Sequence, residues 1–71
     1  MSGEAGESVT RLETFEAPYG RQVTLEDVAY PGGMRLLRLH IREGRRFTVM
    51  DLDPGSAAHL GRALGAWAES V

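Results

Sequence analysis

The chain has no cysteine and no lysine among its 71 residues, and its aromatic side chains are one tryptophan, two tyrosines and two phenylalanines. Without cysteine, neither a disulfide nor a thiolate metal site can hold so small a domain together. No apolar run approaches the roughly 20 residues that span a bilayer, so we expect no membrane segment. Stability must come from apolar packing, completed by a second subunit where one core is too small.

The charge balance is mildly acidic, with eight arginines against ten acidic residues and a net charge of −2. Such a balance gives the chain no overall attraction for nucleic acid. The opening residues, MSGEAGES, lack the basic and apolar regions of a signal peptide. We therefore expect a cytoplasmic protein with a disordered N-terminal tail over residues 1–9 and a single domain over residues 10–71.

Three short breaks in the alternating pattern end in glycine: PYG at 18–20, PGG at 31–33 and REG at 42–44. Each fits a three-residue hairpin loop, in which a type I turn is followed by a residue at positive φ. The loops predict strands over residues 11–17, 21–30, 34–41 and 45–52. The sequence therefore predicts an α+β fold, a four-stranded antiparallel β-meander followed by one C-terminal amphipathic helix packed on the sheet.

The loops also predict the register, because a slip of one residue would turn every side chain of a strand to the other face. The third loop pairs Ile41 with Arg45. One face of the sheet then carries a continuous apolar field, formed by Phe15, Val23, Leu25, Leu37, Leu39, Ile41, Phe47 and Val49.

Opposite charges fall together in the same register. Arg35 lies opposite Asp51, with Asp27 on the diagonal, and Glu26 lies opposite Arg38 on the other face. Cross-strand pairs of opposite charge stabilise a sheet. Their agreement with the apolar field supports the predicted pairing.

A helix is predicted over the segment DPGSAAHLGRALGAWAES. Asp53 suits the N-cap, and Pro54 suits the first helical position, where its missing N–H costs nothing. A stripe of large apolar side chains recurs at helical spacing, formed by Leu60, Leu64, Trp67 and Val71. Beside it runs a line of small residues, Ala57, Gly61, Gly65 and Ala68.

The residues of the common catalytic and metal sites are missing or separated. The serines lie in the tail or the helix, without the strand-to-helix turn of an activated nucleophile. His40 and His59 fall on different elements with no acidic or histidine cluster beside them. Asp51 and Asp53 have structural roles, the first as a partner of Arg35 and the second as a helix cap. We expect a non-enzymatic protein without catalytic, cofactor or metal sites.

A group of basic residues remains on the polar half of the second sheet face and its adjoining loop: Arg38, His40, Arg42, Arg45 and Arg46. The group is a candidate for contact with a phosphate backbone, or it is simply a solvated face. Single-strand binders usually interleave aromatic residues for base stacking. In the predicted register Tyr30, the aromatic residue of this face, lies at the opposite end.

The order of elements and the junction FTVMDLDPGSAAHLGRALGAW resemble the C-terminal part of the positive-cofactor-four type of single-stranded DNA-binding domain. That family has four strands and a helix and works as a dimer. The resemblance covers residues 11–71 as an order of elements. It implies nucleic-acid contacts at Arg38 and Arg46, whereas the acidic balance of this chain departs from the family.

A helix can cover only one face of the sheet, so apolar residues are left over on the other. The predicted leftover patch comprises Val28, Tyr30, Met34, Leu36, Met50 and Leu52. Concentrated exposed apolar surface marks an interaction site, and the last strand is an unprotected sheet edge. We therefore expect a protein-interaction module, an accessory or regulatory factor that forms a homodimer and has an unidentified protein partner. Single-stranded nucleic-acid binding is the alternative.

Overall fold

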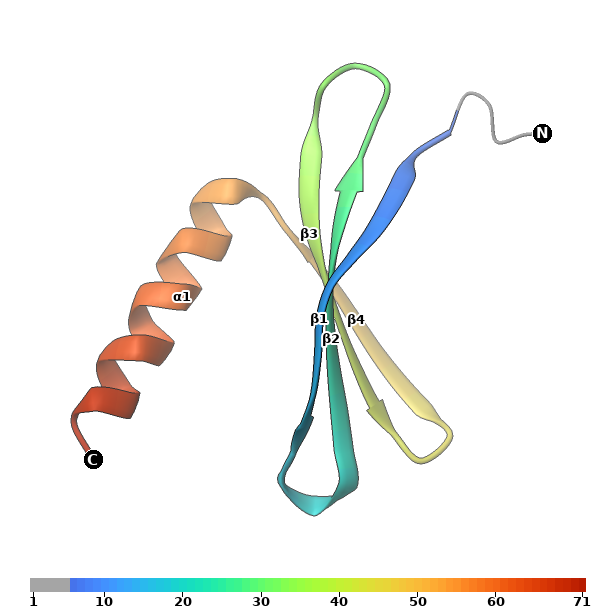
Figure 1. Cartoon of the computed structure of the whole chain (residues 1–71). Helices are drawn as coiled ribbons and strands as arrows, with labels where there is room; N and C mark the ends of the chain where they lie inside the picture. The colour runs from blue at the N-terminus through green and yellow to red at the C-terminus, as the bar shows by residue number, and fades with distance from the viewer. Residues whose placement is uncertain (1–5) are drawn as a thin grey trace.

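The computed structural model describes residues 6–71 and contains one four-stranded antiparallel sheet and one helix (Figure 1). The sheet order is β1-β2-β3-β4, so each strand pairs with its neighbour in the chain. This confirms the predicted α+β fold, with the C-terminal helix packed on the sheet. The elements are β1 (Ser8–Ala17), the 3-10 turn η1 (Pro18–Gly20), β2 (Arg21–Ala29), β3 (Arg35–Glu43), β4 (Arg46–Leu52) and α1 (Pro54–Glu69).

The first strand starts earlier than the sequence suggests. β1 begins at Ser8, inside the segment expected to be a tail, while residues 1–5 of that segment lie outside the described residues. A bulge between Arg11 and Glu13 leaves Leu12 as an extra residue opposite β2. Between the bulge and the first loop, Phe15 pairs with Val23, as the position of that loop predicts.

The first two loops pair their strands as predicted. Tyr30 donates its backbone N–H to the Met34 carbonyl at 2.9 Å, and Gly33 takes the expected positive φ of 95°. In the first loop Tyr19 itself adopts φ 67°, so this loop is not the type I turn that we expected. The guanidinium of Arg21 lies 5.7 Å from the centre of the Tyr19 ring, a cation–π contact across the turn.

The predicted third loop is wrong. Glu43 pairs with Arg46, so the connection is a two-residue turn of Gly44 and Arg45 rather than a three-residue loop. Gly44 has φ 63°, as required at the first central position of a type II′ turn. Both loops need a glycine at positive φ, so the glycine alone did not distinguish them. The two-residue turn has a twist that matches the strands.

The shorter turn displaces β4 by three residues along β3, and an odd displacement exchanges the two faces of a strand. The predicted pairing of Arg35 with Asp51 is therefore wrong, since Asp51 lies opposite Arg38. Arg35 instead pairs with its diagonal neighbour Asp27, at 2.7 and 3.2 Å. Glu26 lies opposite Arg38 as predicted.

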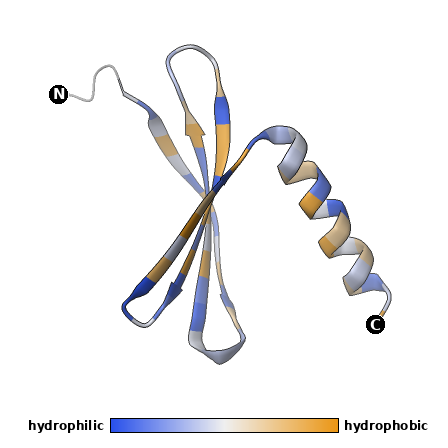
Figure 2. Cartoon of the chain, turned by 180° about the vertical axis from the view of Figure 1, so that it is seen from behind, coloured by the Kyte–Doolittle hydropathy of each residue, from blue (hydrophilic) through white to orange (hydrophobic). Residues whose placement is uncertain are grey.

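Hydrophobic and hydrophilic residues alternate along the strands of the sheet (Figure 2). We call the face of the sheet toward α1 the helix-facing face and the other the outer face. β4 contributes Met50 and Leu52 to the helix-facing face, in place of the predicted Phe47 and Val49, which lie on the outer face. From β1, β2 and β3 the helix-facing face receives its predicted apolar residues, Phe15, Val23, Leu25, Leu37, Leu39 and Ile41.

The hydrophobic core of a single copy is small. In the described part of the chain Val28 is the one fully buried large side chain, and α1 has no buried residue. The helix lies closest to the sheet near its first turns and diverges toward its C-terminus (Figure 1). In a single copy, therefore, the helix-facing face of the sheet and the apolar side of α1 remain partly exposed.

Candidate interaction surface

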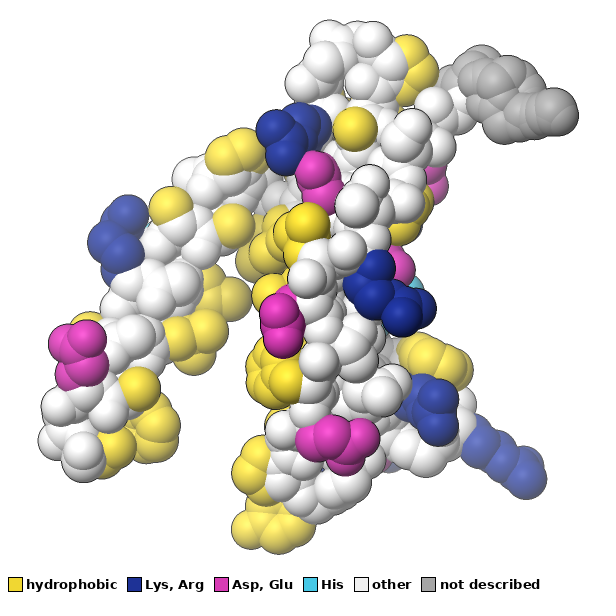
Figure 3. Space-filling view, viewed as in Figure 1, with side chains coloured by type: hydrophobic (Ala, Val, Ile, Leu, Met, Phe, Trp, Pro, Cys, Tyr) yellow, Lys and Arg dark blue, Asp and Glu magenta, His cyan; other side chains and the backbone are white. Residues whose placement is uncertain are grey.

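An apolar groove of about 340 Å³ separates α1 from the helix-facing face of the sheet. In Figure 3 hydrophobic side chains gather on both walls of the hollow between the helix and the sheet. Within the part of the chain that the structure describes, no charged side chain lines it. The lining residues are Phe15, Val23, Leu25, Leu37, Leu39 and Leu52 from the sheet, and Ala57, Leu60, Gly61 and Leu64 from the helix.

The junction between β4 and α1 sets the shape of this groove. Asp53 alone separates the last strand residue, Leu52, from the first helical residue, Pro54. The backbone N–H of Ser56 donates to Asp53 Oδ1 at 3.0 Å, which caps the helix as predicted. Hydrogen bonds from Ser56, from its side chain and then its backbone, lower the pKa of Asp53. This short, capped junction fixes the direction in which α1 leaves the end of β4.

The apolar stripe of α1 becomes more exposed as the groove widens. Leu60 is half-buried near the sheet. Beyond it the exposed fraction is 60% for Leu64, 67% for Trp67 and 85% for Val71. The stripe faces the groove near Leu60, whereas at Trp67 little of residues 6–71 covers it. The C-terminal half of α1 therefore presents an exposed apolar surface.

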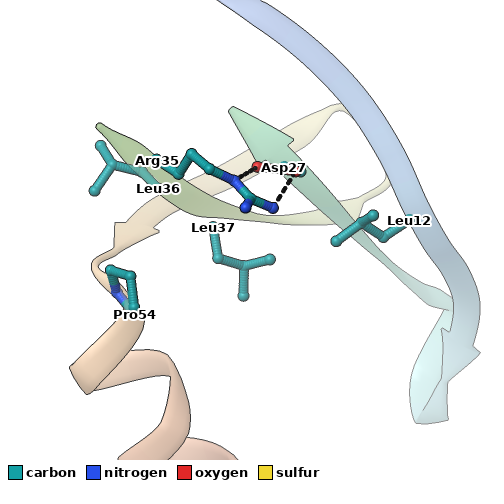
Figure 4. Close-up of a pocket in the computed structure, with 6 residues that line it drawn as sticks. All are labelled: Leu12, Asp27, Arg35, Leu36, Leu37 and Pro54. Atoms are coloured by element: carbon teal, nitrogen blue, oxygen red, sulfur yellow. Dashed lines mark hydrogen bonds and ion pairs between the residues drawn. The ribbon is translucent and has the colours of Figure 1, made fainter. Parts of the chain in front are cut away.

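A second hollow, of about 290 Å³, lies where β1, β2 and β3 approach the start of α1 (Figure 4). Leu12, Leu37 and Pro54 give it apolar walls. The two charged groups on its wall, Asp27 and Arg35, hydrogen-bond to each other. This bonding lowers the pKa of Asp27. Since these charges satisfy each other, the hollow offers a ligand little polar recognition.

The six residues predicted as an interaction patch do not come together. Val28, Tyr30, Met34 and Leu36 share the outer face, whereas Met50 and Leu52 lie on the helix-facing face because of the register of β4. Val28 has no exposed surface at all, while Met34 is 57% exposed.

Sequence reasoning missed the groove as a site. Its lining residues from β1, β2 and β3 were assigned to the apolar field that α1 would cover, whereas Leu52 was assigned to the leftover patch on the other face. It also missed Phe47 and Val49 as outer-face residues, with exposed fractions of 64% and 50%. The pair Gly44-Arg45, which can form a two-residue turn, was the signal in the sequence that could have placed them there.

Two of the candidate nucleic-acid residues are engaged within the protein. Arg38 donates two hydrogen bonds to Asp51, at 2.8 and 3.1 Å, and this pairing lowers the pKa of Asp51. Arg38 also lies 3.8 Å from Glu7. His40 Nε2 lies 3.0 Å from a carboxylate oxygen of Glu26. The carboxylates of Asp51 and Glu7 offset the positive charge of Arg38, and Glu26 lies against Nε2 of His40, so both side chains offer less to a phosphate.

The other three candidates, Arg42, Arg45 and Arg46, form no ion pair within residues 6–71. Arg42 lies on the outer face directly opposite Phe47, whereas Arg46 projects to the helix-facing face and Arg45 occupies the turn. The exposed Phe47 therefore places an aromatic ring beside a free arginine, a combination that the sequence analysis did not find.

Between residues 6 and 71 there is no group of three or more acidic or histidine side chains placed to hold a metal ion. No helix in the same part of the chain has both the length and the apolar character to cross a membrane.

Residues 6–70 match the model of a family of unknown function, DUF6967, and the chain belongs to this family. The match covers every strand and the whole of α1. No curated protein and no solved structure matches the chain.

Proposed function

We propose that this protein is a non-enzymatic interaction module that acts as a homodimer, as an accessory or regulatory factor. The observation that carries the proposal is the uncovered apolar groove between α1 and the sheet. A helix with no buried residue and a sheet with one fully buried large side chain do not make a sufficient core. A second copy supplies the missing apolar surface.

The size of the solvent-accessible surface area supports this proposal. The chain exposes 5461 Å², whereas a compact monomer of its mass, 7.8 kDa, exposes about 4,400 Å². The difference, about 1,100 Å² per copy, belongs to the chain as a whole and is the most surface that a partner would need to cover. Two copies that each buried this area would share an interface of about 2,200 Å², which lies within the range of obligate homodimers.

Sedimentation equilibrium at micromolar concentration tests the proposal. We expect a species of twice the chain mass of 7.8 kDa. Leu64→Glu should shift the protein toward monomer, because it introduces a charge into the apolar groove. Ala66→Glu introduces the same charge on the side of α1 that carries Arg62 and Glu69, away from the groove. This variant should leave the dimer intact. A wild-type monomer throughout the concentration range would refute the homodimer.

A second candidate function is single-stranded nucleic-acid binding at the β3–β4 end of the outer face. The observation that favours it is the exposed Phe47 opposite Arg42, with Arg45 in the adjoining turn. Bases stack on exposed aromatic rings, and unpaired arginines contact phosphates. The net charge of −2 and the pairing of Arg38 and His40 with acidic residues make this the weaker candidate.

Fluorescence anisotropy with a labelled single-stranded oligonucleotide, measured over a range of salt concentrations, tests this second function. The double variant Arg42→Ala, Arg45→Ala should bind more weakly and lower the salt slope by about 1.4, since two phosphate contacts are lost. Arg62→Ala, which removes an arginine from α1, is the control and should bind as the wild type does. Absence of wild-type binding at low salt would exclude the function.

A further inference from the structure

We infer that the occupant of the groove is the α1 helix of a second copy, with each helix docked against the helix-facing face of the other copy. The inference rests on the proposed homodimer and specifies how it is built. It identifies the partner surface as the apolar stripe formed by Leu60, Leu64 and Trp67 of α1 and by Val71, which follows the end of the helix. The arrangement is a twofold one, in which the same surface is used by both copies.

The helix does not close its own groove, because the junction fixes its direction. Asp53 is the single residue between β4 and α1, and its carboxylate holds the Ser56 backbone N–H at 3.0 Å. Pro54 restricts φ at the first helical position. Rotation of α1 onto the sheet would need a change of backbone dihedrals at these capped and restricted positions. An incoming element fills the space without that change.

The occupant must be apolar and elongated. Both walls of the groove are apolar or small side chains, so a charged occupant would lose its hydration without gaining a partner. The C-terminal half of α1 matches this requirement. Its large apolar residues Leu64 and Trp67 are both exposed on the same chain, as is Val71 just beyond the end of the helix.

Pairing of two β4 edges is a different route to a dimer, but it leaves the groove open. β4 forms one edge of the sheet. Phe47 and Val49 on that strand project to the outer face, away from α1. A dimer built only through this edge would cover neither Trp67 nor the lining of the groove. Docking of the second helix accounts for the larger uncovered surface.

The wall contributed by α1 has room for a close neighbour. Gly61 lines the groove, and a Cβ built at Gly61 or at Gly65 would meet no atom within 4 Å. The polar residues of the helix, among them Arg62 and Glu69, lie on the opposite side and would remain in solvent. A second helix can therefore approach the groove side of α1 without burying a charge.

The deciding comparison is Gly61→Leu against Ala66→Leu, each measured by sedimentation equilibrium. Both add a large side chain to α1, and the space around Gly61 means that a single copy accommodates the change. We expect Gly61→Leu to raise the dimer dissociation constant at least tenfold and Ala66→Leu to leave it unchanged. Far-UV circular dichroism should show a helix content at least equal to that of the wild type, since leucine favours helix more than glycine does.

The fluorescence of Trp67, the single tryptophan, provides a second measurement on the wild-type protein. If α1 docks in the partner's groove, the emission of Trp67 should be blue-shifted at high protein concentration and should shift to the red on dilution. This measurement tests helix docking even if the Gly61→Leu variant does not fold.

The possible results separate the inference from the proposed function. A wild-type monomer refutes both. A stable dimer with concentration-independent, solvent-exposed Trp67 emission refutes helix docking and leaves the homodimer standing. A Gly61→Leu variant that dimerises with the wild-type dissociation constant also refutes helix docking and leaves the homodimer standing. Loss of the dimer in Gly61→Leu but not in Ala66→Leu, with blue-shifted Trp67 emission in the wild type, supports the inference.

Discussion

Single residues at the β4–α1 junction decide where the helix begins and in which direction it leaves the sheet. Asp53 satisfies one of the otherwise unpaired N–H groups of the first turn, and Pro54 needs no such partner. These are local effects of one carboxylate and one ring. The shape of the groove nevertheless depends on them, because a frayed first turn would release α1 from its fixed direction.

Replacement of Asp53 by alanine should destabilise the protein, because the Ser56 N–H would lose its acceptor. We expect the melting temperature to fall by several degrees with the fold retained. Asp53→Asn keeps an acceptor at the N-cap and should melt close to the wild type. Thermal unfolding followed by circular dichroism makes the comparison. Equal melting of the alanine and asparagine variants would contradict the role of the cap.

Stability should decrease at acid pH through three aspartates. Hydrogen bonds from Arg35, Arg38 and Ser56 lower the pKa values of Asp27, Asp51 and Asp53, respectively. A pKa lower in the folded than in the unfolded chain gives stability that is present above the unfolded value, about 3.9, and is lost as the pH falls through the folded one.

The melting temperature should therefore change little between about pH 7 and pH 5 and fall steeply below about pH 4. Asp53→Asn removes one of the three titrating groups and should make the acid decline shallower. Melting curves across this pH range give the measurement. A wild-type melting temperature that stays constant down to pH 2 would show that these contacts do not contribute to stability.

At the scale of elements, the β3–β4 turn decides which side chains of β4 face the helix. Gly44 and Arg45 form a two-residue turn, and Gly44 at φ 63° allows it. The turn places Met50 opposite Leu39, whereas a three-residue loop would place Phe47 there. The choice between the two loops displaces β4 by three residues along β3 and thus exchanges its apolar residues between the groove and the outer face.

Replacement of Gly44 by alanine should cost about 1–2 kcal/mol, because a residue with a Cβ is strained at positive φ. Gly32, in the second loop, does not have a positive φ in the structure, and a Cβ there meets no atom within 4 Å. Gly32→Ala is therefore the matched control and should have little effect. Urea unfolding of the two variants measures the difference. A larger loss for Gly32→Ala would argue against this turn.

The register itself can be measured by NMR. Cross-strand contacts between the α-protons or amides of Leu39 and Met50 are expected from the observed pairing. Contacts between Leu39 and Phe47 would restore the three-residue loop and return Phe47 to the helix-facing side.

At the scale of the whole molecule, the proposed homodimer would couple stability to association. The chain buries too little apolar surface by itself, and the groove is the place where the missing burial is available. A protein that is stabilised by binding a second copy melts at a higher temperature when its concentration rises. The domain is therefore expected to behave as a pair of chains rather than as an independent small fold.

The melting temperature of the wild type should accordingly rise with protein concentration between about 1 and 100 μM. Leu64→Glu, which disfavours docking in the groove, should melt at a lower temperature that is independent of concentration. Ala66→Glu should retain the dependence. A wild-type melting temperature that does not change with protein concentration would mean that the whole of the stability lies within one chain.

The sequence by itself determined the elements, the first two hairpin pairings and the helix cap. These depend on local backbone chemistry: a proline or glycine at a turn, an aspartate before a proline, and the spacing of apolar residues. Leu39 opposite Leu25 and Asp53 at the N-cap are confirmed for this reason. Arg38 and His40 were placed on the correct face, since the pairing of β2 with β3 was correct.

Only the tertiary structure decided the register of β4 and the angle of α1. β4 has large apolar residues in both phases of its alternation, Phe47 and Val49 in one and Met50 and Leu52 in the other. Its pattern therefore suits either face, and Gly44 suits either loop. The angle of α1 is likewise a property of how the strand, cap and helix meet in space. The shape of the groove depends on both, and the register of β4 is why the six residues of the predicted patch are divided between the two faces of the sheet.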